Sequence, residues 1–289
     1  MFAIATQQQQ YKTYILSDAV SQSQLAVVPE RGGIVTSWQV QGKELLYLDK
    51  ARFANPSLSV RGGIPILFPI CGNLPDNTYT YKGQQYTLKQ HGFARDLPWE
   101  VTEQVTQECV SLTLGLNSNE STRAVYPFDF QLAFTYKLVG NSLEIQQRCV
   151  NHSDEPMPFS IGLHPYFVAS DKTQLQFEIP ATEFQDQITK TVHPWRGEFD
   201  FNSDEIDVAF KPLSSQSANV TDSSRQLQLQ LDWERNYSTV VFWTIKGKEY
   251  YCLEPWSAAR NALNTGEQLI QLAPKDTWQS IVRLSVNFL

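Results

Sequence analysis

The chain has 289 residues and a formal net charge of −7, with 42% hydrophobic and 18% charged residues. This composition suffices for a large core, and the acidic balance without a basic run argues against a nucleic-acid or anionic-membrane partner. The first residues lack the apolar leader of a secretory signal, and no apolar run approaches the ~18 residues of a membrane span. A cytoplasmic location is therefore expected.

Alternation of apolar and polar residues, which is typical of strands, dominates the chain. The glutamine run at 7–10 is expected to be a loose terminus, and the stretch 37–48 is ambiguous. Turn-rich pieces separate the alternating runs, and no long segment has a helical period. Strands are predicted at 110–116, 130–138, 141–150, 227–233, 238–245 and 280–286.

Many short strands without intervening helices predict an all-β fold, with antiparallel sheets packed face to face or closed into a barrel. The polar, serine-rich segment 211–225 is either a linker or a long surface hairpin loop. The loop is favoured because alternating strands resume directly after it. One large domain over residues 1–289 and two smaller domains both remain open from composition and pattern alone.

The four histidines differ in their neighbours. His152 and His193 lie in turn-like, polar stretches and are expected to be solvated. His164, in SIGLHPYF, precedes a proline, so the strand is expected to end there and its side chain can face a cleft. A core histidine is an equally good interpretation. His91, in KQHGFARD, is followed by a glycine and by Arg95, and this polar cluster favours a binding role.

A carboxylate stands inside an apolar strand at YYCLEPW. An ionised Glu254 is costly there unless it is paired, hydrogen-bonded or protonated. Pro255 is expected to end the strand, so that the carboxylate can turn into a cleft. Arg61, in VRGGIPILFPICGN, belongs either to a kinked edge strand or to a shaped loop that donates to substrate oxygens. Spacing alone leaves both interpretations open.

Motifs for metals and cofactors are absent. The histidines form no H-x-H or H-x-x-x-H pair and the four cysteines form no C-x-x-C pair, so neither a metal site nor a disulfide framework is expected. The lack of a P-loop, a G-x-S-x-G elbow and a G-x-G-x-x-G turn removes support for an NTPase, a serine hydrolase or a dinucleotide enzyme. A histidine and a glutamate remain as candidate catalytic residues.

Three motifs in this order resemble the aldose 1-epimerase (galactose mutarotase) superfamily, and in particular its LacX-like bacterial branch. They are FPICGNLPDNTYTYKGQQYTLKQHGFARDLPWEV, SIGLHPYF and YYCLEPW, within a resemblance that runs from about Arg31 to the C-terminus. The resemblance implies one large antiparallel β-sandwich, called a supersandwich. It also implies interconversion of the α and β anomers of an aldose without a cofactor. A monomer or a homodimer is expected.

The resemblance assigns roles to particular residues. His164 of HPYF would be the general acid and Glu254 of EPW the general base, and an imidazolium beside the carboxylate would stabilise both charges. His91 would contact the sugar, and Asp207, from EIDVAF, would bind its hydroxyls. The other expected substrate contacts are two arginines and several aromatic residues: Arg61, Arg95, Phe68, Tyr166, Trp195 and Trp256.

Alternatives remain. Lys275 stands where the family often has glycine, a turn detail outside the motifs. Arg61 and Arg95 also resemble a branch that acts on hexose 6-phosphates and binds the phosphate with arginines, so the partner is a sugar or a sugar phosphate. A non-catalytic sugar-binding sandwich is a second alternative. A glycoside hydrolase or lyase is a third, and it would need a second acidic residue such as Asp207 near Glu254.

Overall fold

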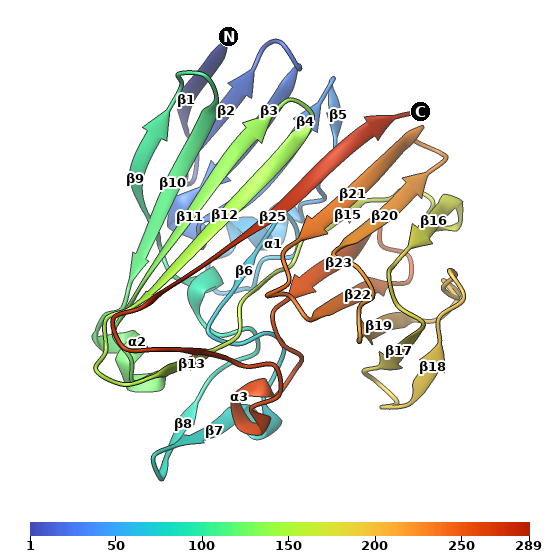
Figure 1. Cartoon of the computed structure of the whole chain (residues 1–289). Coiled ribbons are helices and arrows are strands. Elements are labelled where there is room, and N and C mark those ends of the chain that lie inside the picture. Colours follow the sequence, from blue (N-terminus) through green and yellow to red (C-terminus); the bar gives the residue numbers. More distant parts are fainter.

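The computed structural model describes all residues, Met1–Leu289, and consists mainly of antiparallel strands (Figure 1). The all-β prediction is confirmed, because the longest of three α-helices has only six residues. No helix combines the length and the apolar character needed to cross a membrane. The helices are α1 (Lys50–Ala54), α2 (Glu120–Val125) and α3 (Ala262–Thr265), with 3-10 turns η1 (Pro29–Arg31), η2 (Pro75–Asn77), η3 (Ala94–Asp96) and η4 (Lys172–Gln174).

The first large sheet has eight antiparallel strands. In spatial order they are β16 (Leu175–Glu178), β20 (Ser217–Asp222), β21 (Leu227–Trp233), β25 (Thr277–Phe288), β12 (Ser142–Asn151), β11 (Phe130–Val139), β10 (Val110–Asn117) and β9 (Glu100–Val105). Five of the six predicted runs lie here. The prediction of a surface loop over 211–225 is wrong for residues 217–222. These residues form β20, which pairs with β21 and buries Ala218 and Val220.

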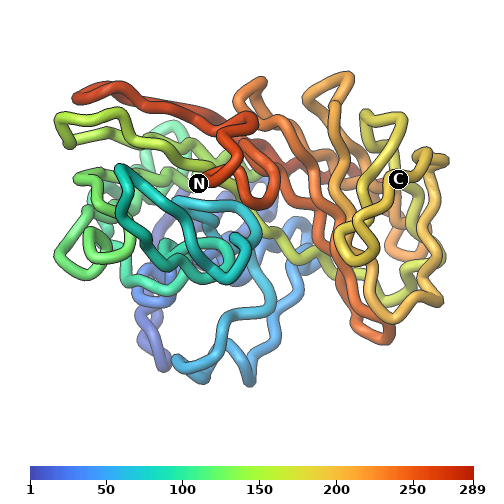
Figure 2. Tube along the Cα trace, turned by 90° about the horizontal axis from the view of Figure 1, so that it is seen from below, coloured from blue at the N-terminus to red at the C-terminus, as the bar shows by residue number.

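The second large sheet holds the sixth predicted run. Its strands, in spatial order, are β18 (Val192–Pro194), β17 (Glu183–Asp186), β19 (Glu205–Phe210), β22 (Thr239–Ile245), β23 (Tyr250–Trp256), β14 (Gly162–Leu163) and β6 (Ile66–Leu67), with β15 (Tyr166–Val168) also paired to β23. Pro255 does not end β23, since it pairs with Val240 and the strand continues to Trp256. Seen from below, the green strands β9–β12 and the yellow strands β16–β18 lie at opposite ends of the molecule (Figure 2).

A smaller sheet and two strand pairs complete the fold. Gln7 and Gln8 pair with β2, so the expectation of a loose terminus is wrong for these two residues. The ambiguous stretch 37–48 contains the end of one strand and a short second one. The elements are β1 (Phe2–Gln8), β2 (Lys12–Asp18), β3 (Ser23–Val28), β4 (Ile34–Val40), β5 (Lys43–Glu44), β7 (Thr78–Tyr81), β8 (Gln84–Thr87), β13 (Met157–Phe159) and β24 (Ile270–Leu272).

The core lies between the sheets and decides which way Glu254 points. One hydrophobic cluster of 59 buried residues extends over the chain. A single domain over residues 1–289 stays a prediction. Tyr251 and Leu253 of β23 belong to this cluster. Because side chains alternate along a strand, Cys252 and Glu254 project from the opposite face of the second sheet. The carboxylate is therefore buried, but outside the main core.

Candidate active site

A cavity of about 240 Å³ lies on the face of the second sheet that points away from the core. Its walls come from segments far apart in the sequence, which only the sheet pairing and the surrounding loops bring together. The lining residues are Ser59, Val60, Arg61, Gln90, His91, Arg95, His164, Tyr166, Glu205, Asp207, Trp243, Glu254, Trp256 and Arg260. The cavity thus combines two histidines, three carboxylates, three guanidinium groups and three aromatic rings.

His164 and Glu254 meet because they are cross-strand neighbours. The pairs Gly162–Trp256 and Tyr166–Cys252 belong to one register, which places His164 opposite Glu254 on the same face. His164 Nε2 lies 3.3 Å from Glu254 Oε1, and both residues are buried. The other carboxylate oxygen accepts a hydrogen bond of 3.1 Å from Trp256 Nε1. A proton can therefore pass directly between the imidazole and the carboxylate.

Burial favours the neutral forms of this pair. It raises the pKa of Glu254 well above its usual value, and the nearby Asp207 carboxylate adds to the rise. Burial also lowers the pKa of His164 to about 3, and the Arg95 guanidinium adds to that fall. The sequence led us to expect two charges that stabilise each other. The two pKa shifts instead favour the uncharged forms, because burial penalises each ion.

His91 is held in place by an unusual backbone. Its φ of 67° lies in the left-handed region, its N–H donates to the Gly72 carbonyl, and its Nδ1 accepts from the Gly72 N–H at 3.0 Å. Burial lowers the pKa of His91 well below its usual value, so the ring is neutral with its proton on Nε2. Gly92 is required next to it, since a Cβ there would lie 2.2 Å from the Phe68 carbonyl oxygen.

Asp207 is anchored by an arginine that the sequence analysis did not single out. Arg260 Nη2 donates to both carboxylate oxygens at 3.0 and 2.9 Å, and its Nη1 donates to Gln187 at 3.3 Å. The guanidinium carbon lies 5.5 Å from the Trp256 ring centroid, within the range of a cation–π contact. This ion pair, in which Nη2 lies between the two carboxylate oxygens, fixes Asp207 as an acceptor at the wall of the cavity.

Two further arginines at the cavity have no carboxylate partner within ion-pair distance. Arg61 lies over the Trp243 ring, with its guanidinium carbon 5.8 Å from the centroid. Arg95 donates from Nη2 to the Gln90 carbonyl at 2.9 Å, and its Nε is buried without a partner. Both groups remain available to an anionic or hydroxylated ligand.

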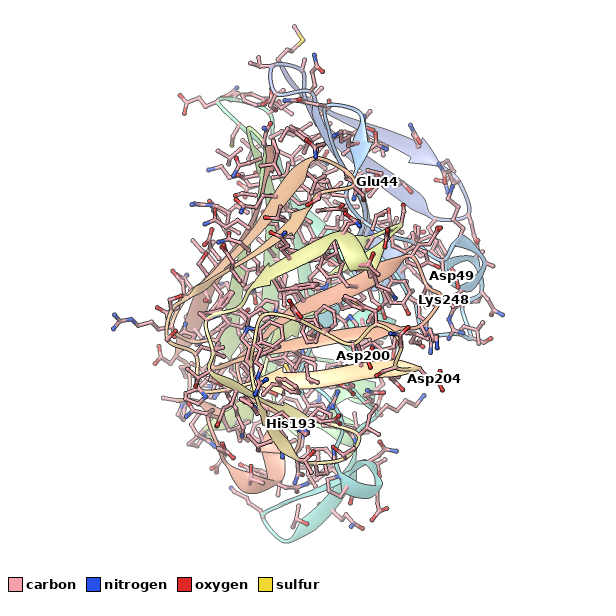
Figure 3. All side chains as sticks on the ribbon, turned by 90° about the vertical axis from the view of Figure 1, so that its right-hand side faces the viewer. Glu44, Asp49, His193, Asp200, Asp204 and Lys248 are labelled. Carbon is pink, nitrogen blue, oxygen red and sulfur yellow. The ribbon has the colours of Figure 1, made fainter.

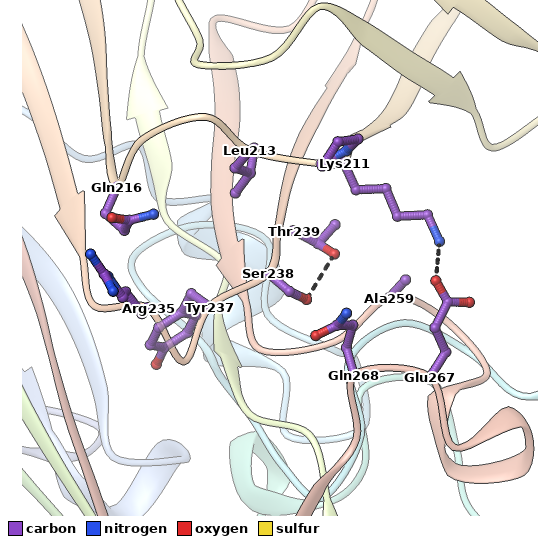
Figure 4. A pocket seen from close by; sticks show the side chains of 11 residues that line it. Lys211, Leu213, Gln216, Arg235, Tyr237, Ser238, Thr239, Ala259, Glu267 and Gln268 are labelled. Carbon is purple, nitrogen blue, oxygen red and sulfur yellow. Dashed lines mark hydrogen bonds and ion pairs between the residues drawn. The ribbon is translucent and has the colours of Figure 1, made fainter.

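A larger cavity elsewhere lacks comparable chemistry. The cavity in Figure 4, of about 460 Å³, has no histidine or cysteine in its lining. Its carboxylate, Glu267, is paired with Lys211 at 2.9 Å, and Ser238 and Thr239 contribute only hydroxyls. The smaller cavity around Glu254 is therefore the candidate active site.

The chain is similar to known proteins over most of its length. The sequence model described as aldose 1-epimerase matches residues 16–285. The chain belongs to the aldose 1-epimerase family. This makes it an isomerase of the epimerase type, and sugars or sugar phosphates are the substrates expected for such a protein. The match begins before Arg31, where the motif resemblance started.

This aldose 1-epimerase family member is similar to several known proteins. The crystal structure of the Slr1438 protein from Synechocystis sp. PCC 6803 has a TM-score of 0.96 and 47% identity, covering 100% of both chains. Protein LacX from Lactococcus lactis subsp. lactis is 26% identical over 75% of this chain and 82% of its own length. A protein named putative glucose-6-phosphate 1-epimerase from Cenchrus ciliaris is 26% identical over 88% of this chain and 79% of its own length. The predicted family and its LacX-like branch are confirmed.

Most of the predicted site residues in this family member line one cavity. Phe68 does not line it, because its side chain is completely buried in the core. Its ring contacts other aromatic rings, and its centroid lies 5.1 Å from that of Phe130. Trp195 packs against Phe210 in a separate region. The residues that the cavity brings together are Glu254, His164, His91, Arg61, Arg95, Asp207, Tyr166 and Trp256.

The remaining histidines lie outside the cavity, as expected. His152 is an exposed residue without strand structure. His193 is also exposed, but it lies on the outermost strand, β18, rather than in a loop (Figure 3). Its Nε2 contacts the Thr191 hydroxyl at 2.7 Å. Neither residue has a role in the candidate site.

Sequence reasoning missed two prominent lining residues, Arg260 and Trp243. Arg260 follows Glu254 by six positions in EPWSAAR, and this proximity to a candidate base was the available signal. Trp243 lies in a predicted strand, where an aromatic residue needs no functional explanation. Only the pairing of β22 with β19 and β23 shows that its ring lies beside Asp207 and Cys252.

Proposed function

We propose that the protein is a mutarotase that interconverts the α and β anomers of an aldose, with Glu254 as general base and His164 as general acid. The observation that carries the proposal is the direct contact of these two side chains, 3.3 Å apart, in one small cavity. The hydroxyl-binding groups His91, Asp207 and Arg61 surround them. A cavity of about 240 Å³ suits one monosaccharide rather than a polymer.

The contact distance suits the reaction. The two reacting oxygens of a cyclic aldose, the anomeric hydroxyl and the ring oxygen, are bonded to the same carbon, so their acid and base must also lie close together. Glu254 takes the proton of the anomeric hydroxyl while the bond between C1 and the ring oxygen breaks. The ring oxygen receives the bonding electron pair and the proton from His164 Nε2. Rotation about C1–C2 and the reverse steps give the other anomer.

The protonation states follow from the geometry. The base and acid act when the shared proton is on His164, which is a tautomer of the neutral pair and has the same net charge. Ring opening moves one proton to Glu254 and one away from His164, so it ends in the neutral pair that burial favours. The ionised tautomer binds the closed sugar, and the neutral one accompanies the open chain. Each half-reaction therefore regenerates the state that the next one needs.

Anomer exchange tests this proposal directly. Exchange of glucose, galactose and glucose 6-phosphate is measured by NMR or polarimetry for the wild type, Glu254→Gln and His164→Asn. Each substitution is expected to lower the rate by at least ~10²-fold, the lower end of the effect of a general acid or base. Near-full activity in either variant contradicts the assignment. Sugar binding without exchange by the wild type favours the non-catalytic binder, and cleavage of a glycoside favours a hydrolase.

A hexose 6-phosphate is the second candidate substrate, and the unpaired arginines favour it. Neither Arg61 nor Arg95 has an acidic partner, although both line the cavity. A charged hydrogen bond to phosphate contributes about 1.5–3 kcal/mol. Arg61→Gln is therefore expected to lower kcat/KM for glucose 6-phosphate roughly 10- to 100-fold more than for glucose. Arg235→Gln, in the cavity of Figure 4, is the matched control. An equal loss for both sugars refutes phosphate binding by Arg61.

A further inference from the structure

Three potential metal ligands meet beside the candidate site, although no motif in the sequence indicates one. His164, Cys252 and Glu254 each offer one ligand atom, and these atoms all lie within 4.8 Å of one another. All three residues are buried. Cys252 has no part in the proposed proton transfers. These transfers therefore do not explain why a thiol lies beside His164 and Glu254.

The sheet itself generates this arrangement. Cys252 and Glu254 are two positions apart on β23, so their side chains project from the same face of the strand. The register of β14 and β15 against β23 places His164 opposite Glu254, on that same face. Two ligands from one strand and a third from its neighbour therefore converge on one point. Their spacing is set by backbone hydrogen bonds rather than by a flexible loop.

The chemistry of the three ligands matches zinc. Zn²⁺ prefers a tetrahedral set of nitrogen, sulfur and oxygen ligands, in which the nitrogen and oxygen atoms lie roughly 3.3–3.5 Å apart. His164 Nε2 and Glu254 Oε1 are 3.3 Å apart already. The Cys252 sulfur lies within 4.8 Å of both atoms, so it has to move closer to them when a zinc ion binds. A thiolate, a carboxylate and a neutral imidazole also balance the two charges of the ion, so the buried complex has no net charge.

We propose that His164, Cys252 and Glu254 form a binding site for Zn²⁺, with the fourth coordination position open to the cavity. Arg95 faces the same cavity and weakens cation binding, whereas the charge of Arg260 is neutralised by Asp207. Bound zinc occupies the nitrogen and the oxygen that the proposed function assigns to the acid and the base. Zinc is therefore a reversible inhibitor. This consequence rests on the proposed function, but the metal binding does not.

Cobalt provides a direct test of the ligands. The purified chain is stripped with EDTA, the chelator is removed, and Co²⁺ is added while the near-ultraviolet absorption is recorded. A thiolate ligand produces a sulfur-to-cobalt charge-transfer band, which Zn²⁺ then displaces. We expect one ion per chain and the band in the wild type and in Cys71→Ser, which removes another buried thiol. Cys252→Ser is expected to lose the band and to bind Zn²⁺ at least ~100-fold more weakly, beyond the usual cost of losing an outer-shell partner.

The outcomes separate the two proposals. Absence of stoichiometric binding, or a band that persists in Cys252→Ser, overturns the zinc site whatever the enzyme activity. If mutarotation is absent but the band follows Cys252, the proposed function fails and the metal site stands. Where both hold, Zn²⁺ inhibits the wild type, EDTA restores the rate, and Cys252→Ser resists inhibition while keeping the metal-free rate. Circular dichroism checks the fold, and Cys252→Ala replaces a serine variant that does not fold.

Discussion

Replacing Glu254 by glutamine is expected to make the folded chain more stable while it removes activity. The carboxylate is 1% exposed, and burial raises its pKa well above the usual value, so holding it in the folded state opposes folding at neutral pH. Glutamine has nearly the same shape. Its carbonyl can accept from Trp256 Nε1, and its amide can donate to neutral His164 Nε2, so both existing contacts at 3.1 and 3.3 Å keep a partner.

The size of the gain follows from these contacts. No cavity forms and both existing contacts keep a partner, so the main change is the removal of the ionisable group, offset in part by the second N–H of the amide. A stabilising substitution of this kind typically raises the free energy of unfolding by about 0.5–2 kcal/mol. For a chain of this size each kcal/mol corresponds to roughly 2–4 °C in Tm. The same substitution is expected to lower anomer exchange by at least ~10²-fold, so stability and activity change in opposite directions.

The pH dependence provides the decisive check. In the unfolded chain Glu254 ionises near its ordinary value of 4.5, whereas in the folded chain it stays protonated to higher pH. The wild type therefore loses stability as pH rises above 4.5, and the advantage of Glu254→Gln grows from nearly zero at pH 4 to its maximum at neutral pH or above. Thermal melts in EDTA measure the difference, with the exposed Glu267→Gln as control. Equal stability at pH 7.5, or an advantage that is largest at pH 4, would refute this reasoning.

Three other substitutions test the architecture of the site. Gly92→Ala is expected to lower the free energy of unfolding by at least ~2 kcal/mol in denaturant melts. Gly83→Ala, at a similar φ but with no atom within 4 Å of the added Cβ, is expected to cost clearly less. Equal losses would exclude the close approach to Phe68 as the reason. Arg260→Met is expected to destabilise the fold by about 3 kcal/mol and to raise KM, because the buried Asp207 loses its ion-pair partner. Arg260→Lys is expected to recover part of the lost stability and part of the lost substrate affinity. Phe68→Ala is expected to lower the free energy of unfolding by about 3–5 kcal/mol without changing KM. A raised KM at unchanged stability would instead show that the Phe68 ring contacts the sugar.

The sequence alone was sufficient for properties that depend on local periodicity and on contiguous motifs. Alternation assigned Leu227, Leu229 and Leu231 to one buried face, because a strand exposes its two faces in turn wherever it lies in the sheet. The motifs around His91, His164 and Glu254 identified the family. Their order along the chain was informative because each motif is a short, unbroken run.

Tertiary structure alone decided what depends on the neighbour across a strand. The polar composition of 217–222 did not show that β20 would be held between β16 and β21, and Pro255 did not show that β23 would continue past it. Asp207 and Arg260, and likewise His164 and Cys252, are distant in sequence and meet only through sheet register and loop packing. A strand's own residues record its two faces, but the long-range pairing determines which side chains share a cavity and whether a carboxylate there is charged.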